Sequence, residues 1–261
     1  MNKFTIGADP EVFVKNAVDA YVSIIGKIGG TKDRPKPLPL GDGYMVQEDN
    51  VALEYNIPPA TNEEDFNKNI YSIMSFLEDH VRSMGLKFGR DSAVLFNPEE
   101  LKDPAALVFG CDPDFNAWKN GDVNPRPKAK DKTLRTCGGH VHIGYEFQSH
   151  EDMIQLIKHM DLFSVPSVFM DKGELRKELY GKAGAFRPKS FGAEYRSFSN
   201  FWIFEEKYRR WVYQTVDHAL DAWQSKSIDV DSERVHILNA INKNNKKAAS
   251  YLIDKYNLQV V

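Results

Sequence analysis

The segment TCGGHVHIGY at residues 136–145 constrains the fold more than any other part of the chain. In an extended strand, side chains alternate between two faces, so His140 and His142 point to one side. Val141 and Ile143 then point to the other side, where they need an apolar layer to pack against. The strand therefore presents two imidazoles about 7 Å apart on a polar face. This pair could bind a metal or a phosphate, or it could be a polar surface without a ligand.

Length and composition are those of an ordinary globular protein. The chain has 261 residues, of which 42% are hydrophobic, so it is long enough to bury a substantial core. A net charge of −3 gives no electrostatic basis for nucleic-acid binding. Cys111 and Cys137 are too few for a disulfide scaffold or a cysteine-rich zinc site. We find neither a signal peptide nor the run of ~20 apolar residues that spans a membrane, and we expect a cytoplasmic protein without a membrane partner.

Period-two apolar patterns predict strands in many parts of the chain. The predicted strands are residues 4–6, 12–14, 21–25, 44–57, 86–96, 105–110 and 193–199, besides the His-x-His strand. Residues 112–136 are dense in Pro, Gly, Asn and Lys and are predicted to form a long loop. Loops of this length inside a domain are commonly functional, and residues 112–118 are our candidate for contacting the substrate.

Helical spacing predicts the remaining elements. Thr61 and Glu64 have the spacing of a capping box, so a helix should begin at Thr61 or Asn62 and end at Gly85. A second helix should follow the cap at Ser149, and residues 205–256 should be mostly helical. Because strands come first, helices follow and no β-α-β alternation exists, we predict an α+β fold with a largely antiparallel sheet. We expect one catalytic domain over residues 1–261, with its core in 4–200 and a helical part in 205–261.

Carboxylates recur with the same alternate spacing as the two histidines. In Asp9-Pro10-Glu11, both acids can face one side of an extended segment, and Pro10 suits an edge or a bulge. Glu48 and Glu54 are separated by an even number of residues, so we expect them to share one face of the predicted strand 44–57. Acids on strand faces are costly to bury unless they bind cations or hydrogen-bond donors.

The segment Glu194-Tyr195-Arg196 places an acid and a guanidinium on one face of another strand. Each acid alone is more often a solvated position. Four such segments in one domain favour a shared site instead. Carboxylate oxygens together with an imidazole are suitable ligands for Mg²⁺ or Mn²⁺.

These segments occur in the order found in a known family. Residues 7–13, 53–59, 137–144 and 194–196 resemble the carboxylate-amine ligases of the glutamine synthetase and glutamate–cysteine ligase superfamily, and the closest resemblance is to compact phage-type members. The His-x-His and Glu-x-Arg strands are its specific parts. The resemblance implies a curved antiparallel sheet that forms a funnel-shaped site, with helices packed outside. Residues 205–261 resemble nothing that we can name.

The activity that the resemblance implies is ATP-dependent amide formation with two or three Mg²⁺ or Mn²⁺ ions. A substrate carboxylate attacks the γ-phosphate, an acyl phosphate forms, and an amine then displaces the phosphate. The implied partners are ATP, a carboxylate such as an amino acid or peptide, and an amine. The superfamily includes both monomers and rings, so an oligomer is possible.

The resemblance also implies roles for individual residues. The metal ligands are Glu11 and Glu54, with Glu48 or Asp49, for one ion, and Asp9, His140 and Glu194 for a second. Asp9 stands where the larger ligases usually carry Glu.

Other residues correspond to the nucleotide and catalytic groups. His142 stands at a phosphate-facing position, and Arg196 would bind the transferring phosphoryl group or the substrate carboxylate. The candidate catalytic residues are Arg196, Glu54 and Glu194. Arg187 is a weaker phosphate candidate that could equally be part of a solvated basic loop. Arg135 belongs to a basic segment that could close over the nucleotide as a lid.

Two other functions fit parts of the same pattern. A zinc hydrolase could use His140 and His142 with a carboxylate, although it would leave the Asp9/Glu11 pair without a role. A non-catalytic nucleotide-binding module of the same fold is the other alternative.

Overall fold

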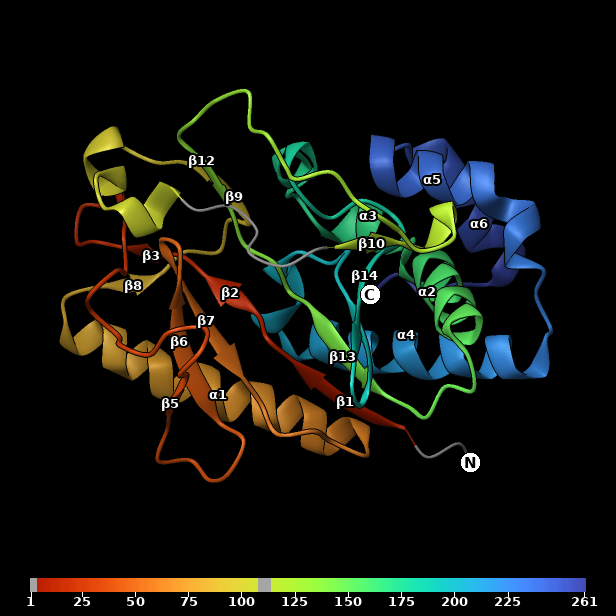
Figure 1. Cartoon of the computed structure of the whole chain (residues 1–261), viewed down its shortest axis with the longest axis horizontal. Helices are drawn as coiled ribbons and strands as arrows, with labels where there is room; N and C mark the ends of the chain where they lie inside the picture. Colours follow the sequence, from red (N-terminus) through yellow and green to blue (C-terminus); the bar gives the residue numbers. More distant parts are fainter. Residues whose placement is uncertain (1–3, 108–113) are drawn as a thin grey trace.

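The computed structural model of the chain describes residues 4–107 and 114–261 and is built on antiparallel strands (Figure 1). The largest sheet has the strand order β1 (Thr5–Ala8), β13 (Val141–Gly144), β15 (Gly192–Tyr195), β14 (Ala185–Lys189), β10 (Phe115–Asn116) and β11 (Asp122–Val123). A second sheet has the order β2 (Glu11–Val12), β7 (Ala52–Asn56), β6 (Met45–Asp49) and β5 (Lys36–Pro37). Two smaller sheets are β4 (Tyr21–Val22), β3 (Val14–Lys15) and β8 (Lys87–Phe88), and β12 (Leu134–Thr136) with β9 (Ala93–Leu95).

The segment that runs from β1 into β2 joins the two larger sheets. On one side, the Glu11 amide donates to the Gly138 carbonyl over 2.9 Å, which extends the pairing with the strand that leads into β13. On the other side, the Tyr55 amide donates to the Pro10 carbonyl over 3.1 Å, next to the β2–β7 pairing. Because the segment is bonded along both edges, the two sheets form one continuous surface. The predicted α+β fold with a largely antiparallel sheet is confirmed.

The helices follow the predicted pattern closely. They are α1 (Glu63–Ser83), α2 (His150–Ser164), α3 (Ser167–Met170), α4 (Glu206–Ser225), α5 (Arg234–Lys243) and α6 (Lys246–Tyr256). Short 3₁₀ turns lie at η1 (Pro98–Leu101), η2 (Pro104–Leu107), η3 (Ala117–Lys119), η4 (Glu174–Glu178), η5 (Asn200–Ile203) and η6 (Val230–Glu233). Of the two predicted starting residues of α1, Thr61 and Asn62, the structure has Asn62 as the N-cap, because the Asn62 side chain accepts from the Asp65 amide; the capping box at Thr61 does not form. Ser149 caps α2 as predicted.

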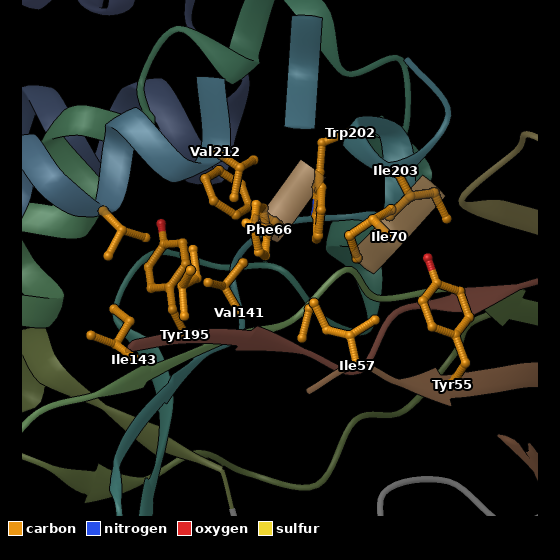
Figure 2. Close-up of a cluster of buried hydrophobic side chains, with 14 of the residues drawn as sticks. Tyr55, Ile57, Phe66, Ile70, Val141, Ile143, Tyr195, Trp202, Ile203 and Val212 are labelled. Carbon is orange, nitrogen blue, oxygen red and sulfur yellow. The ribbon is translucent and has the colours of Figure 1, made fainter. Parts of the chain in front are cut away.

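The hydrophobic core lies between the sheet and the long helices α1, α2 and α4. Figure 2 shows Val141 and Tyr195 of the sheet beneath Phe66 of α1, with Trp202 beside it. The rings of Phe66 and Trp202 stack with their centroids 5.7 Å apart. Since strand side chains alternate, burying Val141, Ile143 and Tyr195 in this core turns their polar neighbours to the opposite face. The candidate site therefore lies on the side of the sheet away from these helices.

Several predicted strands have different limits in the structure. Residues 44–57 form a hairpin of β6 and β7 around Asn50, which has a positive φ of 54°, instead of one long strand. Residues 86–96 contain two short strands, β8 and β9. Of the predicted strand 105–110, the first three residues belong to the 3₁₀ turn η2 and the rest lie outside the described residues. Strand β14, at residues 185–189, was not predicted.

The C-terminal part is helical, as predicted. Trp211, Val212 and Val216 of α4 are buried against the main core. Helices α5 and α6 pack on each other and, through Ile237 and Leu252, contribute to a second apolar cluster. No helix in residues 4–107 or 114–261 combines the length and the apolar character needed to cross a membrane.

Candidate active site

The sheet register aligns the predicted site residues in a row. In the pairing of β1, β13, β15 and β14, His142 lies opposite both Gly7 and Glu194, and Glu194 lies opposite Arg187. Residues in register across neighbouring antiparallel strands present their side chains on the same face. Strands β13, β15 and β14 thus contribute side chains to one polar surface, and β1 borders it at the edge of the sheet.

This surface forms the floor of a cavity of about 320 Å³. The cavity is lined by eight of the predicted residues, which are Asp9, Glu11, Glu54, Arg135, His140, His142, Arg187 and Arg196. Its other charged or polar lining residues include Lys32, Gln47, Asp49, Arg176, Tyr180 and Lys189. Glu194 is fully buried at the base, and its carboxylate contacts three of the basic lining residues.

Asp9 lies between the two imidazoles. The distance from Asp9 Oδ2 to His142 Nε2 is 3.2 Å, and Asp9 Oδ1 lies 3.5 Å from His140 Nδ1. His140 Nδ1 is also 3.6 Å from Glu194 Oε1. Asp9, His142 and Glu194 each offer one ligand atom, and these atoms lie within 4.8 Å of one another. Three donors at this separation can hold one cation.

The charges of this group fix its protonation. Burial alone would raise the pKa of Asp9, but the charge of His142 and hydrogen bonds from both imidazoles hold it well below its ordinary value. The pKa of His140 is lowered to about 4 by burial and by the Arg196 guanidinium. The pKa of His142 is raised, because the attraction of Asp9 outweighs burial. His140 is therefore neutral at pH 7, and Asp9 is ionised.

A second group of acids lies at the β2–β7 pairing. Glu11 and Glu54 are direct cross-strand partners, and Asp49 lines the cavity beside them. Burial and then the charge of Asp49 raise the pKa of Glu11 to about 7. Burial and the charges of Asp9, Asp49 and Glu11 raise the pKa of Glu54 well above its ordinary value. Among the described residues, the cavity ion pairs involve Asp9, Glu194 or Asp114, and none reaches Glu11 or Glu54. The pair is thus a crowded group of acids without a direct ion-pair partner among the described residues, of the kind that a cation relieves.

The opposite side of the cavity is basic. Glu194 forms ion pairs with Lys189 Nζ at 2.6 Å, with Arg187 Nη1 at 3.5 Å and with Arg196 Nη1. The pKa of Glu194 falls to about 2 in spite of its burial and of Asp9, because these guanidiniums and His140 stabilise its anion. The Nε atom of Arg196 also lies 3.5 Å from Asp114 Oδ1. The site consequently has an acidic half and a basic half that meet at Glu194.

Glu48 does not share the face of Glu54, contrary to the prediction. In the β6–β7 hairpin, Gln47 pairs with Glu54 and Asp49 pairs with Ala52. Across a two-residue turn, facing residues are separated by an odd number, so the even-number rule that holds along one strand fails. The Glu48 carboxylate instead accepts hydrogen bonds from the amides of Gly26, Ile28 and Gly29 at 2.8–2.9 Å. Of the two alternatives considered, the structure brings Asp49 to the cavity.

Arg135 is buried, and its guanidinium is engaged by the protein. Nε and Nη2 donate to the Ala106 carbonyl over 3.0 and 2.7 Å, and Nη1 donates to the carbonyls of Lys132 and Leu134. These bonds hold the β12 segment against η2, so the geometry gives Arg135 a structural role rather than the predicted one in a lid. Arg187, by contrast, belongs to strand β14 and not to a solvated loop.

Sequence reasoning missed some lining residues. Lys189 lies two residues after Arg187 on β14, so a correct strand prediction would have found it. Arg176 lies on the 3₁₀ turn η4, and its Nη1 donates to the Ser197 carbonyl over 3.1 Å. No sequence pattern marks Arg176. Within the predicted substrate segment 112–118, residues 112 and 113 lie outside the described residues, and Asp114 contacts Arg196.

The two glycines before the His-x-His strand are needed for close packing. A Cβ on Gly138 would lie 2.3 Å from His140 Nε2, and one on Gly139 would lie 2.3 Å from the Ser199 carbonyl oxygen. The Gly138 amide also donates to Glu11 Oε2 over 2.7 Å. Glycine at position 138 therefore allows the His140 imidazole and the Glu11 carboxylate to lie close to the same stretch of backbone.

Comparison with known proteins supports the family that the sequence predicted. No curated protein matches the chain. Among solved structures, the chain is similar to a bifunctional glutathione synthetase from Pasteurella multocida, with 12% identity and a TM-score of 0.40 over 98% of this chain and 47% of that one. The chain thus spans about half the length of that protein. Residues 131–248, which contain the His-x-His and Glu-x-Arg strands, match the model of the family described as phage phiEco32-like COOH.NH2 ligase-type 2, and this match confirms the predicted resemblance to carboxylate-amine ligases.

Proposed function

We propose that the chain is an ATP-dependent carboxylate-amine ligase that forms an amide through an acyl phosphate. The observation that carries the proposal is the division of one cavity into an acidic half and a basic half. A triphosphate and a carboxylate are both anions, so bringing them together requires positive charge on both sides of the reacting atoms. The family match to COOH-NH2 ligases over residues 131–248 supports the same reaction class.

The acids of the cavity fit divalent cations. Asp9, His142 and Glu194 would hold one ion, with His140 next to them, and Glu11, Glu54 and Asp49 would hold another. The raised pKa of Glu11 and of Glu54 supports this assignment, since neither carboxylate has an ion-pair partner among the described residues. Their oxygen-rich donor set suits Mg²⁺ or Mn²⁺. When bound, the ions would offset the negative charge between the triphosphate and the substrate carboxylate.

The basic residues have separate tasks in this reaction. Arg196, with Arg187 and Lys189, would bind the phosphoryl oxygens while the substrate carboxylate attacks the terminal phosphorus of ATP. The bond from that phosphorus to the bridging oxygen breaks, ADP leaves, and an acyl phosphate remains. The amine nitrogen then attacks the acyl carbon, loses a proton, and expels phosphate. We propose that the curved sheet acts as the funnel expected for this superfamily, with the cavity as its base.

The zinc-hydrolase alternative fits less well. It needs both imidazoles on one ion, whereas the group of potential ligands among the described residues contains His142 and not His140. Arg196 Nη1 lies 3.4 Å from His140 Nδ1, which places a fixed positive charge at one of the two nitrogens through which His140 could bind a metal.

The test is ATP-dependent product formation with hydroxylamine as a general amine. Purified protein is incubated with ATP, Mg²⁺ and pooled amino acids or peptides, and both ADP and acyl hydroxamate are measured. We expect both products in equal amounts, and we expect Glu194→Gln to abolish them. Glu146→Gln is the matched control, because Glu146 is exposed and lies outside the cavity. Tight nucleotide binding without either product would instead indicate the non-catalytic module.

A further inference from the structure

A second cavity adjoins the first one on the far side of Arg196. Its volume is about 200 Å³, and it shares Tyr180, Arg187 and Arg196 with the main cavity. The remaining lining residues are Asp114, Val123, Asn124, Pro125, Arg126, Pro127, Leu179, Gly181, Lys182 and Ala185. Arg196 therefore stands in the wall between two spaces, with Nη1 on Glu194 and Nε toward Asp114.

The second cavity has the opposite charge to the acidic half of the first. Among the described lining residues, Arg126, Lys182, Arg187 and Arg196 contribute four positive charges, and Asp114 contributes one negative charge. Such a space attracts an anion and repels metal ions and free amines. Of the three reactants in the proposed reaction, the carboxylate substrate has the charge that this cavity attracts. ATP is also an anion, but a nucleotide triphosphate is too large a ligand for a space of 200 Å³.

Asp114 adds a more specific requirement. Its Oδ1 lies 3.5 Å from Arg196 Nε, and the Asn124 side chain donates to its Oδ2 over 3.3 Å. The Asn124 backbone N–H also donates to the Asp114 backbone carbonyl, over 2.6 Å, so the main chain that carries the carboxylate is held as well. A fixed cation beside a fixed anion is complementary to a ligand with a carboxylate and an ammonium group attached to the same carbon. An α-amino acid has this arrangement.

The walls of the cavity fit the rest of such a ligand. Leu179 and Ala185 are buried and apolar, while Val123 and Pro125 form an exposed apolar rim. These surfaces can contact a short hydrocarbon side chain. Lys182 and Arg126 are exposed at the outer side and leave room for a second anionic group.

We propose that the second cavity binds the carboxylate substrate as a free α-amino acid, with its ammonium group on Asp114 and its carboxylate at Arg196, facing the main cavity. The inference rests on the proposed function, because it assigns a binding site to one of the three reactants of the proposed ligase reaction. It makes Asp114 a specificity-determining residue and gives Arg196 contact with both the phosphoryl group and the substrate.

The test compares Asp114→Asn with Asp122→Asn. Asp122 is exposed on the neighbouring strand β11 and lines neither cavity, so it is a matched control for the same chemical change. Hydroxamate formation is measured with each of the common L-amino acids, with their N-acetyl forms and with simple monocarboxylates. We expect activity with free amino acids alone. Asp114→Asn should raise the KM for the amino acid at least about tenfold and leave the KM for ATP unchanged within about twofold, while Asp122→Asn behaves as wild type.

Direct binding separates this inference from the proposed function. Saturation-transfer NMR with the amino acid pool should report binding to wild type and Asp122→Asn, and none to Asp114→Asn. Binding of this kind without turnover would overturn the ligase function and support the second site. Equal use of N-acetylated or simple carboxylates, or an Asp114→Asn variant that matches the control, would overturn the second site and leave the ligase function standing. A rise in the KM for ATP alone would assign this cavity to the nucleotide and also overturn the proposal.

Discussion

Replacing Glu11 by glutamine should stabilise the cation-free protein and at the same time remove its activity. Burial and the charge of Asp49 raise the pKa of Glu11 from 4.5 to about 7. The native state thus binds this proton more tightly than the unfolded state, so the free energy of unfolding falls as the pH rises from about 4.5 to 7. At 1.36 kcal/mol per pKa unit, the ionised carboxylate costs about 3 kcal/mol at pH 8.

The neutral amide avoids that cost and keeps an oxygen that can accept from the Gly138 amide. We therefore expect Glu11→Gln to raise the free energy of unfolding at pH 8 by up to about 3 kcal/mol, which corresponds to roughly 5–10 °C in Tm. The gain should vanish at pH 4, where the wild-type side chain is protonated in both states.

The assay is thermal unfolding in EDTA, followed by circular dichroism at pH 4, 6 and 8, and repeated with Mn²⁺. Glu146→Gln, an exposed substitution, is the control and should leave Tm unchanged. Mn²⁺ should raise the Tm of wild type and have much less effect on Glu11→Gln. A Glu11→Gln variant that is less stable than wild type at pH 8 would refute the view that the acids repel each other without a cation.

Four further outcomes follow from the site. The affinity of wild type for Mn²⁺, measured by calorimetry, should weaken as the pH falls below about 7, because a proton on Glu11 then competes with the metal. Equal affinity at pH 6 and pH 8 would contradict this. Arg196→Lys should reduce turnover at least ~10²-fold with normal circular dichroism, since an ammonium cannot bridge Glu194 and Asp114 as the guanidinium does. Glu48→Gln should lower the free energy of unfolding by about 1–2 kcal/mol, because an amide cannot accept with both terminal atoms from the three backbone donors; a chemical denaturation curve matching wild type would exclude that role. Gly138→Ala should displace the His140 ring at a cost of about 1–3 kcal/mol and weaken Mn²⁺ binding, which calorimetry would detect.

The period-two pattern predicted the part of the site that depends on single strands. His140 and His142 line the cavity together, and Glu194 contacts Arg196 on the same face, because alternation along one strand is fixed by backbone geometry. The pattern failed at Asn50, where the chain reverses without the glycine that usually marks a two-residue turn. Asn50 is held there by tertiary contacts, in which its side chain donates to the Ala106 carbonyl and accepts from Arg135. A local reading of the sequence could not include those contacts, so Glu48 was placed on the wrong face.

Strand β14 was missed for a different reason. It contains Arg187, Pro188 and Lys189, and neither proline nor a run of basic residues is typical of a strand. The register with β15 places both basic side chains against Glu194, so the strand is stabilised partly by ion pairs that no local pattern reveals. Arg176 lies beyond any such rule, because its place at the cavity results from the packing of η4 against the segment after β15.

The acids of the cavity come from positions as far apart as residue 9 and residue 194, on strands that the chain brings together only after most of it has been made. A cation shared by these acids would act as a cross-link between segments at the first and the last strands in the sequence, β1 and β15. Protein stripped of divalent ions during purification should then unfold faster and be cut more readily by proteases at the β1–β2 segment, even though every covalent bond and every apolar contact of the core is the same.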